Sequence, residues 1–338
     1  MKLLNNPLLI THYSLPDTLK TMKILANDGI DPVGKKMLED AGFTVDTQNI
    51  PQDQLASRLN EYDALTVRSA TKVRKELLDA CPNIKLIGRG GVGMDNIDVD
   101  YARSKGIAVI NTPAASSLSV AELVFAHLFS GVRFLEQANR DMPVKGDTAF
   151  NDLKKNYAKG IELRGKTLGV LGFGRIGREA AKMAIGLGMN VLAFDIFDFN
   201  PEVELVFADE QKMKFKVSSV SKEYILKNAD FITLHVPAVD GKPVIGADEF
   251  ALMKKGAAIV NCARGGVIDE AALINALDSG HLAFAGLDVF DNEPTPSKAI
   301  LSHAKISLSP HIGASTNEAQ ERIGVELAQR MIEELSKA

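Results

Sequence analysis

LGVLGFGRIG, residues 168–177, is the stretch that decides the fold. Its first four residues predict a short buried strand, and the glycines after them follow the pattern G-x-G-x-x-G. A helix is predicted to leave the glycines, because Ile176, Ala180 and Ala184 recur on one helical face. Glycine turns alone are common, but a strand before them and a helix after them make this pattern specific.

The three glycines of the pattern indicate a phosphate-binding loop. Gly172 allows the tight turn, Gly174 lets the backbone approach a pyrophosphate, and Gly177 allows helix and strand to pack closely. The pyrophosphate would lie on the exposed amides at the start of the helix, where Arg175 and Ile176 stand.

Asp195 ends the next predicted strand, residues 191–194, about 20 residues after the loop. A carboxylate there accepts hydrogen bonds from the ribose hydroxyls of a dinucleotide, and its charge would repel a 2′-phosphate. The sequence therefore predicts NAD, not NADP, as the cofactor. The alternative is a tight turn followed by a surface acid, which requires strand, helix and acid to coincide by chance.

Short apolar runs alternate with helical segments on both sides of this loop, which predicts an α/β fold of parallel sheets covered by helices. The runs before the loop are residues 24–26, 43–45, 64–67, 86–87 and 108–110. The runs from the loop onward are residues 168–171, 191–194, 231–235, 257–260, 283–288 and 306–309. Two such series in 338 residues predict two doubly wound parallel-sheet domains.

The segments between these runs are predicted to be helical. Residues 33–40 and 52–59 are short helices, and a single long helix is expected over residues 119–140. An amphipathic helix is expected over residues 317–335. Residues 204–221 contain alternating apolar side chains, and we assign no function to them.

Composition excludes several classes of protein. The formal net charge of −4 gives no reason to expect nucleic acid or an anionic membrane as a partner. Apolar runs fall short of the roughly 20 residues of a membrane span. Cys81 and Cys262 lack a metal-like spacing, so a reduced, cytoplasmic protein without a metal is expected. Residues 1–22 are interpreted as an N-terminal extension of unknown purpose.

A dinucleotide cofactor implies hydride transfer, which needs a base for the hydroxyl proton and a cation beside the reacting oxygen. In sheets of this class such groups lie at the carboxyl ends of strands. His311 follows the last strand and His235 ends an earlier one, so position favours His311 and leaves His235 open. Structural or surface roles are expected for the other histidines, His12, His127, His281 and His303.

Two further strand ends supply charged groups. Arg264 follows the strand at residues 257–260 and precedes two glycines, and Glu293 follows the strand at residues 283–288. From spacing alone, Arg264 could instead be a helix-end charge and Glu293 an ordinary turn carboxylate.

Several ordered motifs together resemble the D-2-hydroxyacid dehydrogenase family, from about Lys23 to the C-terminus. They are GFGRIG (172–177) with Asp195, NCARGGVID (261–269), LDVF (287–290) with Glu293 and Pro294, and SPHIG (309–313). The resemblance implies that Arg264 binds the carboxylate and carbonyl oxygen of the substrate, a task that suits its planar fork. It also implies that Glu293 orients the histidine and that His311 is the acid/base.

The same resemblance implies a domain organisation and further contacts. A Rossmann NAD-binding domain, residues 119–310, is expected to be inserted into a flavodoxin-like substrate domain formed by residues 23–118 and 311–338. A homodimer through the NAD domain and its helix at 119–140 is implied. The further implied cofactor contacts are Val236, Pro237, Cys262, Ala263, Asp288, Gly313 and Ala314.

Two loops in the first series are similar to those of the branch of the family that oxidises 3-phospho-D-glycerate in serine biosynthesis. They are VRSATKV (67–73) and GRGGVGMDN (88–96). The similarity implies that Arg68 contacts the substrate phosphate beside Ser69. It also implies that the backbone of Gly91 and Val92 either offers amides to the substrate carboxylate or lines the nicotinamide. Alternatively, Arg68 pairs with a neighbouring acid.

Two other functions stay open. A reductase of glyoxylate, hydroxypyruvate or another 2-keto acid would use the same scaffold and differ at the loop of Arg68. An NAD-sensing binding protein, as in the corepressors of this family, would keep the same residues and act through partners.

Overall fold

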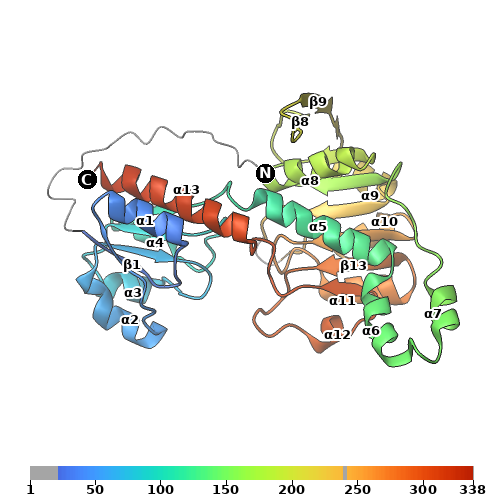
Figure 1. The fold of residues 1–338 in the computed structure, drawn as a ribbon, viewed down its shortest axis with the longest axis horizontal. Coiled ribbons are helices and arrows are strands. Elements are labelled where there is room, and N and C mark those ends of the chain that lie inside the picture. The colour runs from blue at the N-terminus through green and yellow to red at the C-terminus, as the bar shows by residue number, and fades with distance from the viewer. Residues whose placement is uncertain (1–21, 239–241, 338) are drawn as a thin grey trace. The chain divides into compact units, whose positions relative to one another are not determined.

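The computed structural model describes residues 22–238 and 242–337 (Figure 1). The chain divides into two compact units. Unit 1 is Met1–Ser116 with Asn317–Ala338, and unit 2 is Ser117–Thr316. Residues 1–21 of the predicted extension, with His12, lie outside the described residues.

The edges of the units differ from the predicted domain boundaries. The sequence places the boundaries after residues 118 and 310, whereas the units divide after Ser116 and Thr316. His311, expected in the substrate domain, therefore lies in unit 2 with Arg264 and Glu293.

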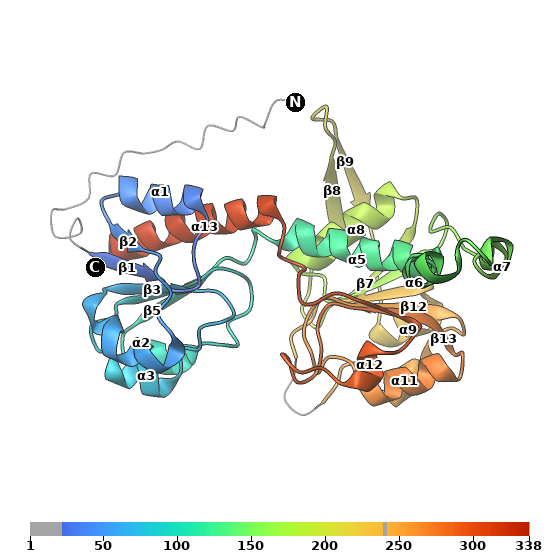
Figure 2. The same ribbon diagram turned by 60° about the horizontal axis from the view of Figure 1, so that its bottom comes forward.

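Unit 1 contains a five-stranded parallel sheet in the order β2-β1-β3-β4-β5. The strands are β1 (Lys23–Ala26), β2 (Thr44–Asp46), β3 (Ala64–Val67), β4 (Leu86–Arg89) and β5 (Ala108–Asn111). The helices are α1 (Pro32–Asp40), α2 (Gln52–Arg58), the 3-10 helix η1 (Leu59–Glu61), α3 (Lys75–Ala80), α4 (Val99–Ser104) and α13 (Asn317–Leu335). Helices α2 and α3 lie on one face of the sheet and α1 and α13 on the other (Figure 2). Apolar side chains of α2, α3 and α4 pack in one cluster, and those of α1 and α13 pack in another.

Helices α1 and α13, from opposite ends of the chain, lie side by side (Figure 1). They meet at a pair of glycines, Gly34 and Gly324. A Cβ atom on Gly34 would lie 2.4 Å from the carbonyl oxygen of Gly324, so a larger residue would separate the helices. Leu327, Ala328 and Met331 of α13 fill the core beneath this contact. The terminal helix is therefore an integral part of unit 1.

Unit 2 contains a seven-stranded parallel sheet in the order β10-β7-β6-β11-β12-β13-β14. The strands are β6 (Thr167–Leu171), β7 (Asn190–Phe194), β10 (Ser218–Ser219), β11 (Phe231–Leu234), β12 (Ala257–Asn261), β13 (Leu282–Leu287) and β14 (Ile306–Leu308). α5 (Ser117–Val132) and α8 (Arg175–Gly186) cover one face. The other face is covered by α9 (Lys222–Asn228), α10 (Ala247–Leu252), α11 (Glu270–Asp278) and α12 (Lys298–Leu301).

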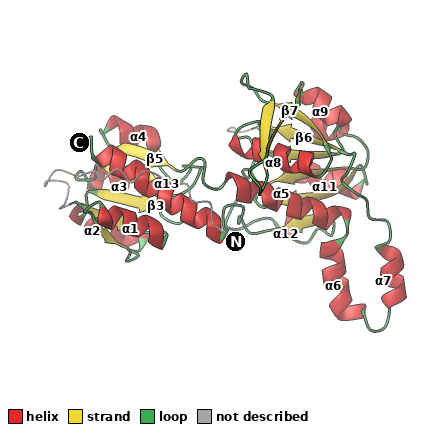
Figure 3. Cartoon of the chain, turned by 45° about the horizontal axis from the view of Figure 1, so that its top comes forward, coloured by secondary structure: helices red, strands yellow, loops and turns green. Residues whose placement is uncertain are grey.

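The prediction of a single helix over residues 119–140 is wrong. The chain forms α5 and α6 (Leu135–Lys145), bent by 56° relative to each other, and α7 (Phe150–Asn156) follows (Figure 3). Phe134 has a φ of 56°, in the left-handed region, where a right-handed helix cannot continue. Within the described residues, no single helix is long and apolar enough to cross a membrane, and α5 with α6 meets that test only as a bent pair.

Residues 202–216 form a β-hairpin for which the sequence predicts no element. β8 (Glu202–Val206) pairs antiparallel with β9 (Lys212–Lys216) and projects from unit 2 (Figure 2). Val203 is buried and Phe215 packs with it on the core, whereas Glu204 and Lys214 face each other across the strands. This alternation is typical of a half-buried strand.

Candidate active site

Residues 172–174 connect β6 to α8, and residues 175–177 form the first turn of α8. Gly172 has a φ of 93°, and a Cβ atom there would lie 2.4 Å from the carbonyl oxygen of His235. A Cβ atom on Gly177 would lie 2.1 Å from the carbonyl oxygen of Gly172. At Gly174, by contrast, a Cβ atom would meet no described atom within 4 Å. The loop is therefore open at the amino end of α8, where a pyrophosphate would bind.

Asp195 follows β7 and is held against this loop. Its Oδ2 accepts a hydrogen bond from the Phe173 amide (2.7 Å), and its Oδ1 accepts one from the Phe197 amide (3.2 Å). Arg175, which is exposed, and Ile176, which is half-buried, form the first turn of α8. A carboxylate fixed beside an open glycine loop is the arrangement that binds a dinucleotide, so these residues fit NAD.

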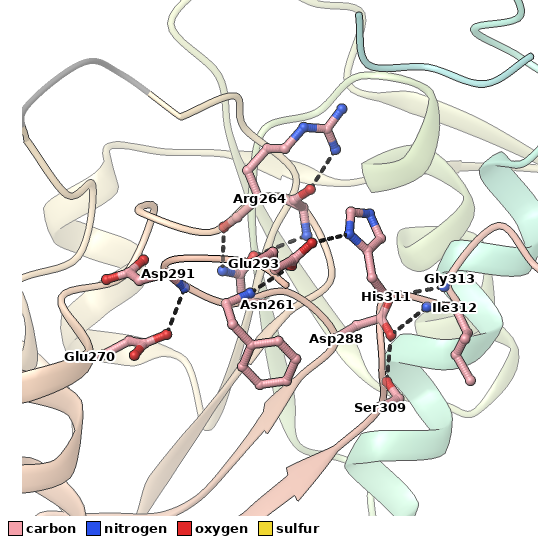
Figure 4. Close-up of polar contacts among 12 residues, drawn as sticks. Asn261, Arg264, Glu270, Asp288, Asp291, Glu293, Ser309, His311, Ile312 and Gly313 are labelled. Atoms are coloured by element: carbon pink, nitrogen blue, oxygen red, sulfur yellow. Dashed lines mark hydrogen bonds and ion pairs between the residues drawn. The ribbon is translucent and has the colours of Figure 1, made fainter. Parts of the chain in front are cut away.

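His311 and Glu293 form a close pair after β14 and β13 (Figure 4). Nδ1 of His311 lies 2.8 Å from Oε2 of Glu293, and Oε1 of Glu293 accepts a hydrogen bond from the Phe290 amide (2.9 Å). The His311 side chain is 50% exposed, so it can reach a bound molecule. Its backbone φ of 54° is one that a non-glycine residue keeps only when its surroundings hold it.

Arg264 lies in a loop after β12 that Asn261 organises. The Asn261 side chain donates to the Arg264 carbonyl oxygen (2.8 Å) and accepts from the Ala263 amide (3.0 Å). A Cβ atom on Gly265 would lie 2.0 Å from the carbonyl oxygen of Phe290, so glycine lets this loop approach the loop after β13. Arg264 itself donates through Nη1 to the Ala263 carbonyl oxygen (2.6 Å). Sequence reasoning missed the role of Asn261, whose position inside a motif was its only signal.

Asp288, expected to contact the cofactor, has a structural role in the same site (Figure 4). It is 1% exposed, and its Oδ1 accepts hydrogen bonds from the Ser309 hydroxyl (2.6 Å) and the Ile312 amide (2.8 Å). Its Oδ2 accepts one from the Gly313 amide (2.8 Å). The buried carboxylate therefore holds the chain on both sides of His311. Nothing in the sequence pattern indicates this role.

The remaining predicted cofactor contacts lie near strand ends. Cys262 and Ala263 are buried directly after β12. Burial, with the charge of Asp288, raises the pKa of the Cys262 thiol well above its usual value, so it stays protonated. Val236 is half-buried and Pro237 exposed after β11, and Ala314 is half-buried after Gly313.

His235, the other candidate base, lies in an unsuitable environment. Burial lowers its pKa to about 3. Its Nε2 lies 3.1 Å from the Thr233 hydroxyl, and its Nδ1 is buried without a hydrogen-bond partner among the described residues. A histidine with so low a pKa is a poor proton acceptor near neutral pH. His235 is therefore the poorer of the two candidates for the base.

In unit 1, Arg68 lies in a loop held by Asp28. Oδ2 of Asp28 accepts hydrogen bonds from the amides of Arg68 (2.7 Å) and Thr71 (3.0 Å), and its Oδ1 accepts one from the Thr71 hydroxyl (2.6 Å). Arg68 and Gly90 line a pocket of about 280 Å³ within unit 1. Among the described residues, none forms an ion pair with the Arg68 guanidinium, so the alternative pairing with an acid is not seen.

The other predicted substrate contacts lie in the same unit. Ser69 is exposed next to Arg68. Gly91 has a φ of 142°, and a Cβ atom there would overlap the guanidinium of Arg89. Val92 is half-buried, and its carbonyl oxygen accepts a hydrogen bond from the Asn111 side chain (2.6 Å).

The chain is similar in sequence and in structure to known proteins. The family profile described as "D-isomer specific 2-hydroxyacid dehydrogenase, NAD binding domain" matches residues 125–313. D-3-phosphoglycerate dehydrogenase of Sus scrofa is 40% identical over 313 residues, which are 92% of this chain and 56% of that protein. The chain thus spans little more than half the length of that relative.

Two further proteins match the chain over nearly their whole length. Hydroxypyruvate reductase of Thermotoga maritima is 40% identical over 318 residues, which are 93% of this chain and 98% of that protein. The crystal structure of D-lactate dehydrogenase from Aquifex aeolicus, complexed with NAD and lactic acid, superposes with a TM-score of 0.71 at 28% identity. The superposition covers 91% of this chain and 94% of the D-lactate dehydrogenase chain.

Proposed function

This chain belongs to the D-isomer specific 2-hydroxyacid dehydrogenase family, and we propose that it oxidises 3-phospho-D-glycerate at the C2 hydroxyl with NAD as hydride acceptor. The product is 3-phosphohydroxypyruvate. The observation that carries this proposal is the His311–Glu293 pair, joined at 2.8 Å, because it supplies an oriented acid/base group.

His311 is the group that takes the hydroxyl proton. A carboxylate only accepts hydrogen bonds, so the hydrogen between His311 and Glu293 belongs to Nδ1. Nε2 then presents its lone pair, and it removes the proton of the C2 hydroxyl as the C–O double bond forms. The resulting imidazolium is stabilised by the Glu293 carboxylate in a charge-assisted hydrogen bond.

Arg264 binds the substrate carboxylate and polarises the C2 oxygen. A guanidinium matches a carboxylate with two parallel hydrogen bonds, which fixes the orientation of C2. The carbonyl oxygen of Arg264 is itself fixed by Asn261, so the base of the side chain is held in place.

The open glycine loop and Asp195 hold the cofactor. Residues 172–177 offer backbone amides to the pyrophosphate, and Asp195 offers its carboxylate to the ribose hydroxyls. Bound NAD supplies the acceptor for the hydride that leaves C2 with its electron pair. Charge at Asp195 disfavours the additional phosphate of NADP.

Arg68 supports a phosphorylated substrate. Its backbone is fixed by Asp28, it lines a pocket, and its guanidinium forms no ion pair with a described acid. A phosphate is the natural partner for such a cation.

The test is NADH formation from 3-phospho-D-glycerate, D-glycerate and D-lactate by the wild-type chain and two arginine variants. Arg68→Ala removes the proposed phosphate contact, whereas Arg103→Ala changes an exposed arginine of α4 as the control. Losing a hydrogen bond to a charged group costs about 1.5–3 kcal/mol, so Arg68→Ala should lower kcat/KM for phosphoglycerate roughly tenfold to a hundredfold. Equal losses on all three substrates would remove the support for phosphoglycerate.

A second candidate is reduction of hydroxypyruvate or glyoxylate. It is favoured by the match to the Thermotoga maritima reductase, of which the chain covers 98%. NADH oxidation with these keto acids, faster than any phosphoglycerate turnover and insensitive to Arg68→Ala, would establish it. NADH binding without turnover on any of these substrates would instead support an NAD-sensing protein.

We also infer a homodimer that involves the first helices of unit 2. Large apolar side chains are exposed there, although nine of the 16 residues of α5 are buried. They are Leu118 and Phe129 of α5, Leu135, Met142 and Val144 of α6, and Phe150 of α7. A second copy would bury them, as exposed apolar patches commonly indicate. Light scattering should show a dimer for the wild type and a monomer for Val144→Glu. A monomeric wild type would contradict the inference.

A further inference from the structure

His127 is a buried histidine in the middle of α5 that the proposed chemistry does not use. It is 3% exposed, yet both its ring nitrogens have partners. Nδ1 lies 2.8 Å from the Ser307 hydroxyl in β14, and Nε2 lies 3.0 Å from the Ser309 hydroxyl. The absence of a side chain at Gly286 makes room for His127, because a Cβ atom on Gly286 would lie only 2.6 Å from the His127 Cβ. The site is therefore shaped around this imidazole.

The hydrogen positions in this cluster follow from the acceptor at its end. The Asp288 carboxylate can only accept, so the Ser309 hydroxyl donates its single hydrogen to Asp288 over 2.6 Å. Ser309 must then accept from His127, which places a hydrogen on Nε2. Nδ1 is left to accept from the Ser307 hydroxyl. Burial lowers the pKa of His127, which keeps the ring in this neutral form.

The chain of hydrogen bonds ends on the segment that carries the acid/base. Asp288, at one end of the cluster, also accepts from the amides of Ile312 and Gly313, the two residues after His311. Ser309, two residues before His311, is the link to His127. His127 thus reaches both sides of His311, whose left-handed backbone needs such support.

We propose that His127 is a positioning residue that, through Ser309 and Asp288, fixes the loop of His311 in its reactive conformation. This inference rests on the proposed role of His311 as the acid/base. A misplaced acid/base slows the chemical step much more than it weakens binding. Removal of His127 should therefore lower kcat and leave cofactor affinity nearly unchanged.

The experiment compares His127→Leu with His127→Gln. Leucine fills the space without hydrogen bonds, whereas the glutamine amide offers one acceptor and one donor in place of the two ring nitrogens. In His127→Leu, the amides of Ile312 and Gly313 should exchange their hydrogens at least about tenfold faster. The same variant should lose at least about tenfold in kcat, with NADH affinity within about twofold. His127→Gln should restore exchange and kcat to within about threefold of the wild type.

Two more variants make the comparison specific. Ser309→Ala breaks the same chain at its next link, so kcat of the double variant with His127→Leu should equal that of Ser309→Ala alone. His281→Leu is the control, because it alters another histidine of unit 2 whose Nε2 is buried and has no described hydrogen-bond partner. It should leave exchange at Ile312 and Gly313 at the wild-type rate.

The outcomes separate this inference from the proposed function. A wild-type chain inactive on every 2-hydroxy and 2-keto acid tested would overturn the proposed function, and amide exchange would still judge the role of His127. Unchanged exchange at Ile312 and Gly313 in a His127→Leu variant that binds NADH would overturn the positioning role. If His127→Leu does not fold, the same exchange measurement on Ser309→Ala decides the matter, and unchanged exchange there refutes the chain.

Discussion

His235→Gln should make the chain less sensitive to acid, and the size of the effect follows from the burial of one ring. Burial lowers the pKa of His235 to about 3, from an ordinary value of 6.5. The unfolded chain therefore binds a proton at this residue below pH 6.5, whereas the folded chain does not until about pH 3. Stability from this group is fully present above pH 6.5 and is lost as the pH falls from 6.5 toward 3.

The magnitude comes from the proton-binding difference. Each pH unit across this window changes the free energy of unfolding by about 1.4 kcal/mol. Between pH 7 and pH 5, His235 alone should therefore cost the wild type about 2 kcal/mol, and about 4 kcal/mol by pH 3. Glutamine has no charge in this range, so His235→Gln should be spared that loss.

The assay is urea unfolding at pH 7, 6 and 5, followed by far-ultraviolet circular dichroism because the chain has no tryptophan. The difference in unfolding free energy between variant and wild type should move by about 2 kcal/mol in favour of the variant between pH 7 and pH 5. Parallel curves would refute the reasoning, since they would mean that the ring takes up protons equally in both states. The variant should also keep kcat within about threefold, because the base is elsewhere.

Three other substitutions test the fold and the cofactor loop. Gly177→Ala places a methyl 2.1 Å from the Gly172 carbonyl oxygen, so NADH affinity in a fluorescence titration should fall at least about tenfold, or roughly 1.4 kcal/mol; unchanged affinity would contradict the close packing. Asp195→Ser removes the charge beside the loop, and the ratio of kcat/KM for NAD over NADP should drop about tenfold, whereas a constant ratio would exclude Asp195 from cofactor selection. Gly34→Ala places a methyl 2.4 Å from the Gly324 carbonyl oxygen, so the free energy of unfolding measured with urea should fall by about 1–3 kcal/mol. An unchanged free energy of unfolding would mean that α1 and α13 can separate without cost.

The sequence predicts most strands of the two parallel sheets and the terminal helix, because their burial is encoded locally. β3 coincides with the predicted run at residues 64–67, and α13 with the predicted helix at residues 317–335. Strands of a covered parallel sheet are buried on both faces and form continuous apolar runs. A helix with one buried face repeats its apolar residues every three or four positions. Both patterns can be recognised without knowledge of the partner element.

The break between α5 and α6 could not be predicted in this way. It depends on the left-handed conformation of Phe134, a residue type that rarely adopts it, and the nearby Gly131 lies within α5 and not at the break. The hairpin of β8 and β9 escaped for a related reason. Val203 and Phe215 pack on the core of unit 2, whereas Glu204 and Lys214 face each other across the two strands. The strands therefore depend on a neighbouring element that the local pattern does not identify.

The candidate site shows the same division between local and distant causes. His311, Arg264 and Glu293 could be selected because each follows a strand, where parallel sheets expose their functional groups. The hydrogen bonds from Asp288 and His127 that hold the loop of His311 could not, because each joins residues at least 21 positions apart in the sequence. His127 bonds Ser309 across 182 positions, and neither residue type indicates a pairing.

Carboxylates that bind backbone amides are the common support of these loops. Asp28 holds the loop of Arg68 in unit 1, while Asp195 and Asp288 hold the glycine loop and the loop of His311 in unit 2. Loops beyond the ends of strands have no ladder partners for their amides, and a charge-assisted bond is stronger than a neutral one. The apolar cores of the sheets do not depend on these bonds. Replacing such a carboxylate by its amide should therefore loosen a functional loop while the sheet beneath it stays folded, so activity is more sensitive than stability to change at these positions.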